Sequence, residues 1–384
     1  MISKKKAIIG SIVLVVVTAI LTSTVQLALG NKVVISKDLY ESYKKYNKLI
    51  GLQQIVEEDF YQEVSEDDLV QGAIKGMFSG LDDIYSQYYT KEEFEQLKEQ
   101  TSGSFVGIGV YISATSDDDY ITIIAPIEGS PAEKSGIKSG DKVIKVDDQN
   151  VYANESDKAI SMIKGKAGTN VKLTIKRGEE EFDLTIKREE IVSKSVESKV
   201  LDGNIGYLKI TSFNENTYDE FKADLESLKE KNIKGLVLDL RNNPGGLLDI
   251  CAEIADDLIG EGTIVYTKDN KGDKEYLKSD KNKLGLPIAV LVNGGSASAS
   301  EILTAAIVDN NEGIAIGTTT FGKGLVQSVR ELKDGTGYKL TTAQYFTPNG
   351  DYINGKGIEP KIVEEDESIQ LDVAVEWIKE QIKK

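Results

Sequence analysis

A turn between two apolar segments reads Asn293-Gly294-Gly295-Ser296-Ala297-Ser298-Ala299-Ser300-Glu301. The segment before it, residues 287–292, is short and rich in branched side chains, which predicts a buried strand. The segment after it, residues 302–308, is rich in alanine and other apolar residues, which predicts a packed helix. The small residues between them therefore predict a sharp turn from strand to helix.

A serine hydroxyl on this turn would lie near the backbone N–H groups of a helix N-terminus, where negative charge is stabilised. Acyl transfer requires both a nucleophile and donors aimed at the developing oxyanion, so the turn suits that chemistry. The alternative interpretation is a serine-rich helix cap, which contributes only stability, about 0.5–2 kcal/mol. The stretch by itself leaves both interpretations open.

The chain contains no histidine and a single cysteine, Cys251. The lack of histidine excludes the Ser-His-Asp and Cys-His catalytic arrangements and histidine-based zinc sites. A single cysteine excludes an intramolecular disulfide and a cysteine-cluster metal site. We therefore expect no metal and no cofactor. A base for a serine nucleophile would have to be a lysine, a carboxylate or a terminal amine.

The 46 basic and 63 acidic residues give the chain a formal net charge of −17. Such a surface repels nucleic acid phosphates, and no basic patch with interleaved aromatic residues occurs, so we expect no nucleic acid partner. The length of 384 residues predicts two or three domains, and a hydrophobic content of 40% suffices for a sizeable core.

Residues 1–30 predict a transmembrane anchor or a signal segment. Lys4-Lys5-Lys6 precedes the uncharged residues 7–29, which as a helix would span roughly 34 Å, enough to cross a bilayer. The lysines favour a cytoplasmic N-terminus and export of the rest of the chain. Ala28 and Gly30 also fit the cleavage site of a removed signal peptide, and a buried helix of a soluble domain is the third interpretation. The first two interpretations place the main body outside the cytoplasm, either on a single-pass anchor in the cell membrane or secreted.

Residues 31–102 predict helices with one heavily charged side. Leu69, Ala73 and Met77 recur every four residues, and Thr90 with Glu93 has the spacing of a capping box. We expect this region to be a stalk, a cap over the main body or a dimer contact, without chemistry of its own.

Residues 103–191 predict a compact domain of short strands and two short helices. Its order of elements, with a second helix near 156–164 and a hairpin around Arg177-Gly178, resembles a PDZ domain of the bacterial, circularly permuted kind. The resemblance implies that its opening loop captures a chain-terminal carboxylate while the peptide adds as a strand beside it. A sheet domain without a ligand is the alternative. The loop consists of Phe105, Val106, Gly107, Ile108, Gly109 and Val110.

Strands and helices alternate over residues 192–365. The strand predicted at 233–240 runs into Arg241-Asn242-Asn243-Pro244-Gly245-Gly246 and then into a helix, and the same succession of strand, glycine turn and helix recurs at 288–309. Two such crossovers predict a layered α/β core with its chemistry at the strand ends. A pair of glycines also suits a plain tight turn, so this motif alone does not identify a site.

A second stretch, Thr318-Thr319-Thr320-Phe321-Gly322-Lys323-Gly324-Leu325-Val326-Gln327, offers a base. Lys323 stands between two glycines and close to two apolar residues, and the stretch carries no other charge. Most lysines are solvated surface groups. The combination of a histidine-free chain, a serine on a helix-starting turn and this uncharged setting makes Lys323 the candidate base.

Together these motifs resemble the carboxyl-terminal processing peptidase family. The Ser-Ala-Ser-Ala-Ser-Glu turn is followed by Phe-Gly-Lys-Gly, whose lysine stands 25 residues after the middle serine, and then by a glutamine. Asp-Leu-Arg-Asn-Asn-Pro-Gly-Gly and the Gly-Lys-Gly-Ile-Glu-Pro of residues 355–360 also match, and the resemblance covers roughly residues 40–365. It implies an α/β (α+β) multidomain chain with N-terminal helices, a membrane anchor and a PDZ domain inserted before a crotonase-like α/β protease core at 192–365. Apolar residues at helical spacing predict a C-terminal helix within 366–384.

The resemblance also implies roles for five residues. Ser298 resembles the nucleophile of the family and Lys323 its general base, with Gln327 orienting the lysine. The N–H groups of Gly245 and Ala299 resemble the oxyanion hole. On a straight strand Lys323 and Gln327 would lie about 13 Å apart, so a direct contact requires a bend, which the glycine after Lys323 permits.

Ser296 and Ser300 compete with Ser298 for the nucleophile's role. Helix geometry does not separate the three serines, so the choice of Ser298 rests on the family motif. A free lysine of pKa about 10.4 is almost fully protonated at pH 7, and burial lowers a lysine pKa by about 3–5 units, so Lys323 requires dry surroundings. We hypothesise that a substrate tail in the PDZ domain closes the cleft and aligns Lys323 with Ser298. Lys164 stands where many family members carry arginine, so a bidentate contact there would be altered.

The sequence thus predicts a serine endopeptidase that cleaves exported proteins at or near their C-termini. Its partners would be protein or peptide substrates with free C-termini, and the family resemblance implies a homodimer. One alternative is a catalytically inactive PDZ scaffold that binds peptide tails without turnover. The other is an acyl-CoA enzyme, which export from the cytoplasm argues against.

Overall fold

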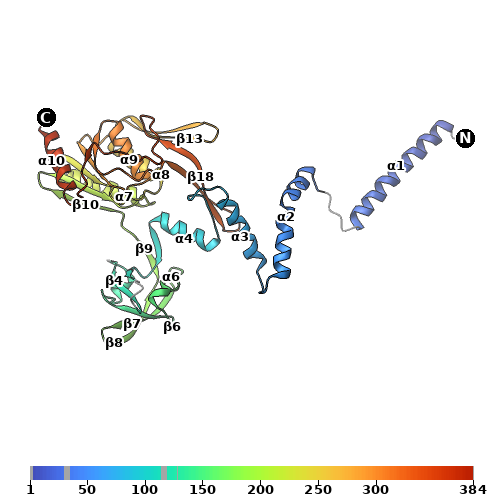
Figure 1. The fold of residues 1–384 in the computed structure, drawn as a ribbon, viewed down its shortest axis with the longest axis horizontal. Coiled ribbons are helices and arrows are strands. Elements are labelled where there is room, and N and C mark those ends of the chain that lie inside the picture. The colour runs from blue at the N-terminus through green and yellow to red at the C-terminus, as the bar shows by residue number, and fades with distance from the viewer. Residues whose placement is uncertain (1–2, 30–34, 114–118, 128, 384) are drawn as a thin grey trace. The chain divides into compact units, whose positions relative to one another are not determined.

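The computed structural model of the chain describes residues 3–29, 35–113, 119–127 and 129–383 (Figure 1). The chain divides into two units, residues 1–77 and residues 78–384. Gly30, part of the predicted cleavage site, lies outside the described residues. The same holds for residues 31–34 of the predicted helical region and for Lys384 at the end of the predicted C-terminal helix.

The first unit is helical. Of the helices in the described ranges, α1 (Lys4–Leu29) alone has the length and apolar composition to cross a membrane, over Lys4–Val25. α2 (Lys37–Asp59) begins after Ser36, whose side chain accepts a backbone N–H of the first turn. α3 (Glu66–Ser79) opens with three acidic residues, which stabilise the positive end of a helix.

A six-stranded sheet organises the second unit. Its order is β10-β11-β12-β15-β16-β19, with β10 antiparallel to β11 and every other pair parallel. This arrangement confirms the predicted layered α/β core, because β12 and β15 each lead through a turn into a helix. The strands are β10 (Val196–Leu201), β11 (Ile205–Ile210), β12 (Gly235–Asp239), β15 (Ile288–Val292), β16 (Gly313–Gly317) and β19 (Ile362–Val363).

Helices cover both faces of this sheet (Figure 1). Successive side chains of a strand point to opposite faces, so a continuous apolar run serves two layers. In β12, Leu236 and Leu238 belong to the larger core cluster, whereas Val237 packs with Ala374 and Ile378 of the C-terminal helix. The helices are α7 (Thr217–Glu230), α8 (Leu248–Leu258) and α9 (Ala299–Asp309) on the first face and α10 (Gln370–Ile382) on the second.

An antiparallel sheet, which the sequence analysis did not predict, lies beside the core. β18 (Gly337–Phe346) pairs with β1 (Gln87–Tyr89), β13 (Gly262–Asp269) and β17 (Leu325–Glu331), and β14 (Lys274–Ser279) pairs with β13. β17 begins two residues after Lys323, so this sheet carries the candidate base.

A third sheet forms the small domain that precedes the core. The predicted peptide-capturing loop at 105–110 includes the end of β2 (Ser104–Gly107) and the start of β3 (Val110–Ser113), which belong to different sheets. The capping box predicted at Thr90 is present and begins α4 (Lys91–Ser102). The remaining elements are α5 (Pro131–Lys134), α6 (Ser156–Ile163), β4 (Ile121–Pro126), β5 (Lys142–Val146), β6 (Gln149–Asn150), β7 (Asn170–Arg177), β8 (Glu180–Lys187) and β9 (Glu189–Val192).

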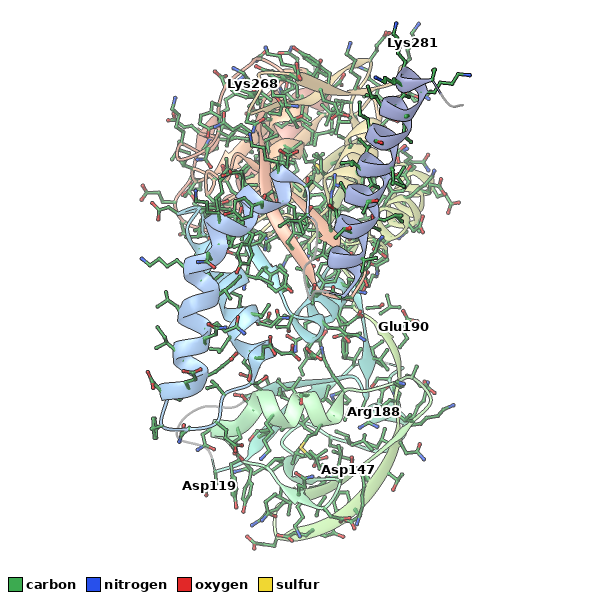
Figure 2. The ribbon with its side chains drawn as sticks, turned by 90° about the vertical axis from the view of Figure 1, so that its right-hand side faces the viewer. Asp119, Asp147, Arg188, Glu190, Lys268 and Lys281 are labelled. Atoms are coloured by element: carbon green, nitrogen blue, oxygen red, sulfur yellow. The ribbon has the colours of Figure 1, made fainter. Side chains whose placement is uncertain are left out.

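Arg188 closes the C-terminal end of α6 (Figure 2). Its guanidinium donates from Nη2 to Met162 O at 2.7 Å and from Nε to Ile163 O at 2.8 Å. The last carbonyls of a helix lack intrahelical partners, so a cation that binds them stabilises the helix end. Arg188 lies between β8 and β9, so these bonds fix α6 to the segment that joins the two strands.

Candidate active site

Ser298 occupies a strained turn immediately before α9. Its φ and ψ are 55° and −114°, in the positive-φ region that residues with side chains rarely adopt. A Cβ atom built on Gly245 would lie 2.8 Å from Ser298 Cβ and 2.7 Å from Ala297 O, so glycine is required at this approach. The turn that follows β12 therefore lies directly against the turn that follows β15.

The three serines of the turn differ in what their hydroxyls do. Ser296 and Ser300 are fully buried, and their Oγ atoms donate to Leu240 O at 2.8 Å and to Asn243 O at 2.9 Å, respectively. Ser298 is only partly buried. Two hydroxyls thus join this turn to the neighbouring one, and the accessible hydroxyl belongs to Ser298.

Glu301 joins the serine turn to the stretch that contains Lys323. Its side chain is fully buried, and Oε2 accepts the backbone N–H groups of Ser298 and Lys323, each at 2.8 Å. Oε1 accepts the Thr320 hydroxyl at 2.6 Å and the Gly322 N–H at 2.7 Å. Four donors on one carboxylate compensate for the burial of its charge. A single side chain therefore holds the backbones of two residues that are far apart in the sequence.

The amine of Lys323 is partly buried beside aromatic and charged groups. Its Nζ lies 4.6 Å from the centre of the Tyr85 ring. Burial, and secondly the positive charge of Lys339, hold the pKa of Lys323 below its ordinary value, while the charges of Glu301 and Asp83 act in the opposite direction. A general base must be unprotonated to act, so a lowered lysine pKa suits this role.

The two predicted oxyanion-hole residues lie side by side. A Cβ atom on Gly245 would be 2.9 Å from the nitrogen of Ala299, which is the first residue of α9. The first N–H groups of a helix lack intrahelical acceptors, so the Ala299 N–H suits the stabilisation of an oxyanion. The Gly245 N–H donates to Asn243 Oδ1 at 2.9 Å in this structure.

Gln327 is bonded within the antiparallel sheet. Its Nε2 donates to Leu325 O at 3.1 Å and to Thr341 Oγ1 at 3.5 Å. A register shift between Val326 and Gln327 interrupts the regular pairing of β17 with β18. Within the described ranges, no hydrogen bond joins Gln327 to Lys323 or Lys323 Nζ to Ser298 Oγ. The structure thus brings the backbones of the nucleophile and base together without joining their side chains.

The glycine turn is held by an ion pair that the sequence analysis missed. Arg241 donates to Asp239 from Nε at 2.9 Å and from Nη2 at 2.6 Å, and its Nη1 donates to Glu367 O at 3.0 Å and to Gln370 Oε1 at 3.1 Å. Asp239 also accepts the Tyr207 hydroxyl at 2.9 Å. The Asp-Leu-Arg spacing could have indicated this ion pair, because residues two apart at a strand end point to the same face.

The other residues that the sequence analysis missed carried weaker signals. Glu301 has the Ser-x-x-Glu spacing of a capping box, which predicts its bond to the Ser298 N–H but not its bonds to the lysine stretch. Asp83, Tyr85 and Lys339 come to the site from segments far away in the sequence, and nothing in their local sequence indicated this placement.

The predicted peptide loop borders a groove of about 410 Å³. Lys164 Nζ pairs with Glu99 Oε2 at 2.6 Å in this groove and lies 5.7 Å from the centre of the Phe105 ring. Val106 does not line the groove in the described part of the chain. The five predicted residues that do line it are Phe105, Gly107, Ile108, Gly109 and Val110.

Three protein-family models match the chain. The model described as the activating protease CtpB N-terminal domain matches residues 9–93, the PDZ domain model matches residues 96–176, and the peptidase family S41 model matches residues 204–364. The S41 match contains the serine turn, the glycine turn and the lysine stretch.

Similar proteins agree with these matches. The carboxy-terminal processing protease CtpA of Bacillus subtilis (strain 168) is 41% identical over 354 residues, which cover 91% of this chain and 76% of that protein. A probable CtpA-like serine protease of Staphylococcus epidermidis is 42% identical over 326 residues, which cover 84% of this chain and 66% of that protein.

Solved structures also resemble this chain. A photosystem II D1 C-terminal processing protease has a TM-score of 0.52 and 28% identity, with coverage of 88% of this chain and 96% of that one. A putative S41 protease from Bacteroides fragilis, with a TM-score of 0.50 and 15% identity, shares the fold. The predicted mixed α/β organisation, with a PDZ domain before the protease core, is confirmed.

Proposed function

Because the chain belongs to the carboxy-terminal processing peptidases of peptidase family S41, which are serine-type peptidases, we propose that Ser298 is its nucleophile and Lys323 its general base. The observation that carries this proposal is the bridge through Glu301, which accepts the backbone N–H groups of both residues. The burial of Ser296 and Ser300 supports the choice of Ser298, because their hydroxyls are engaged in bonds between the two turns.

In the proposed reaction the neutral amine of Lys323 removes the proton from Ser298 Oγ as that oxygen attacks a peptide carbonyl carbon. The negative charge that develops on the carbonyl oxygen is stabilised by the Ala299 N–H. The Gly245 N–H contributes when it leaves Asn243 Oδ1. The lysine then returns its proton to the leaving amine, and a water molecule releases the acyl group by the same steps.

Two further assignments complete the site. Gln327 orients the Lys323 amine once β17 shifts relative to the sheet, since its amide is bonded elsewhere in this structure. Substrate binding in the PDZ domain, assigned to residues 103–191, brings the amine of Lys323 to Ser298 Oγ in the protease core, assigned to residues 192–365. The supporting observation is the groove beside the loop that begins at Phe105.

The substrates that we propose are exported proteins with free C-termini, cut at or near those ends. The apolar helix α1 would anchor a single-pass protein in the membrane, with the catalytic body outside the cytoplasm. The alternative is secretion after removal of residues 1–30. The family relationship favours a homodimer.

The test uses the membrane-embedded full chain and an unfolded protein substrate with a free C-terminus. Ser298→Ala and Lys323→Ala should each abolish cleavage, whereas Lys333→Ala, at an exposed turn, should retain it. The same substrate with an amidated C-terminus should be cleaved more slowly if the groove captures a carboxylate. Cleavage by Lys323→Ala would refute the assigned base, and tight binding without turnover by the unmodified chain would favour the inactive scaffold.

A further inference from the structure

Tyr345 carries a buried hydroxyl group without a partner. The side chain lies in β18 and is 2% exposed, and its Oη makes no hydrogen bond within the described ranges. An unpaired buried hydroxyl lowers stability, so its presence calls for a physical reason. A phenylalanine would fill the same space in the core without this cost.

The hydroxyl of Tyr345 lies inside the candidate active site. The hydroxyl group that lies near it is that of Ser298, and the charge of Glu301 acts on it. Its backbone is also tied to the base, because the Tyr345 N–H donates to the carbonyl of Gly324 at 3.1 Å. Tyr345 is thus fixed to the lysine stretch through its backbone, and its buried hydroxyl lies near that of Ser298.

The phenol keeps its proton throughout the working pH range. Burial raises the pKa of Tyr345 well above its ordinary value, and the charge of Glu301 adds to this effect. A group that does not ionise cannot compete with Lys323 for the serine proton. What it can supply is an O–H donor from a buried position.

We propose that Tyr345 is a further catalytic residue, whose O–H donates a hydrogen bond to Ser298 Oγ as that oxygen loses its proton to Lys323. This inference rests on the proposed roles of Ser298 and Lys323. The Oγ–H bond breaks and an N–H bond forms on the lysine. An Oγ–C bond forms to the peptide carbonyl carbon as the C=O π bond breaks, and its electron pair goes to the carbonyl oxygen. Tyr345 keeps its own proton. Because the bond to Tyr345 strengthens as negative charge grows on Oγ, it stabilises the transition state more than the resting enzyme.

The test is Tyr345→Phe in the full chain, which removes one oxygen atom and keeps the ring. We expect kcat for a peptide substrate to fall by about tenfold to a hundredfold while KM stays within about twofold. The melting temperature should be unchanged or higher, because the variant loses an unpaired buried group. The rate at which a fluorophosphonate modifies Ser298 should fall together with kcat, because that reaction depends on the nucleophile and not on peptide binding.

The matched control is Tyr266→Phe, which removes a phenol hydroxyl from β13, where the ring stacks on Phe346 at 5.0 Å. It should leave kcat unchanged. 3-Fluorotyrosine at position 345, which retains the hydroxyl, should give a kcat within about threefold of the unmodified chain. A Tyr345→Phe variant with full kcat, or one whose loss of kcat follows a lower melting temperature, would overturn the inference. Cleavage by Ser298→Ala would instead refute the proposed function itself, so the two failures are distinguishable.

Discussion

Replacing Glu301 by glutamine tests whether one carboxylate assembles the active site. The carboxylate accepts four hydrogen bonds, two on each oxygen, from Ser298, Lys323, Gly322 and Thr320. A glutamine side chain has the same shape but only one acceptor oxygen, and its NH₂ group is a donor. At least two of the four donors would therefore face another donor. If the NH₂ group replaces Oε1, the bonds from Thr320 and Gly322 are lost, and if it replaces Oε2, those from Ser298 and Lys323 are lost.

The magnitude follows from the number of bonds lost. A buried donor left without its charged acceptor costs about 1–3 kcal/mol, so Glu301→Gln should lower the free energy of unfolding by about 2–6 kcal/mol. For a domain of this size, the melting temperature should fall by about 5–20 °C. The matched control is Glu312→Gln, since Glu312 accepts one bond from Lys283 at 2.8 Å near the surface, and it should cost about 1 kcal/mol or less.

The pH dependence of Glu301→Gln separates its electrostatic effect from its structural one. The negative charge of Glu301 opposes the lowering of the Lys323 pKa. The unprotonated amine is the active form, so activity rises with pH through that pKa. Removing the charge lowers the pKa further, and the acid limb of the kcat/KM profile should move to lower pH while the maximal rate falls. A variant with the unmodified melting temperature, rate and profile would refute the reasoning.

Three further substitutions probe the same site. Lys339→Met should raise the Lys323 pKa and move the acid limb to higher pH, while Asp83→Asn should move it to lower pH. Shifts of the same sign in the two kcat/KM profiles would contradict this electrostatic assignment. Gly245→Ala should lower kcat by more than about tenfold and also lower the melting temperature, because its Cβ would lie 2.8 Å from the Cβ of Ser298 and its φ is 99°. Unchanged kinetics and melting would show that the two turns do not need this close approach.

The layered core was predictable because its signals are local. A branched apolar run such as residues 288–292 forms a strand that is buried on both faces, and the glycine turn and alanine-rich helix that follow it are read from consecutive residues. The antiparallel sheet was not predicted. Its central strand, β18, has mostly partly buried side chains, and besides the neighbouring β17 it pairs with β1 and β13, which lie more than 70 residues away, so these two partners depend on tertiary packing.

The residues of the site are likewise of two kinds, those that a sequence motif indicates and those that it does not. Ser298 and Lys323 stand in motifs that distinguish them within the sequence, whereas the groups that set the properties of the lysine do not. Lys339 belongs to β18, and Asp83 precedes β1, so both approach the amine only after the antiparallel sheet has formed. Their influence on the Lys323 pKa could therefore not be predicted from sequence patterns.

The position of Glu301 allows a buried carboxylate to hold the site together without forming an ion pair with the amine of the base. A carboxylate that pairs directly with the lysine amine would stabilise the protonated form and oppose catalysis. Glu301 instead binds the backbone N–H of Lys323, and no carboxylate lies within 4.0 Å of Nζ in an ion pair in the described part of the chain. The backbone end of the lysine is thus anchored by the negative charge, while the amine end lies 4.6 Å from the centre of the Tyr85 ring in partly buried surroundings, and burial favours the neutral form. A carboxylate can therefore hold the base next to the nucleophile without keeping it protonated, because the length of the lysine side chain separates the two ends.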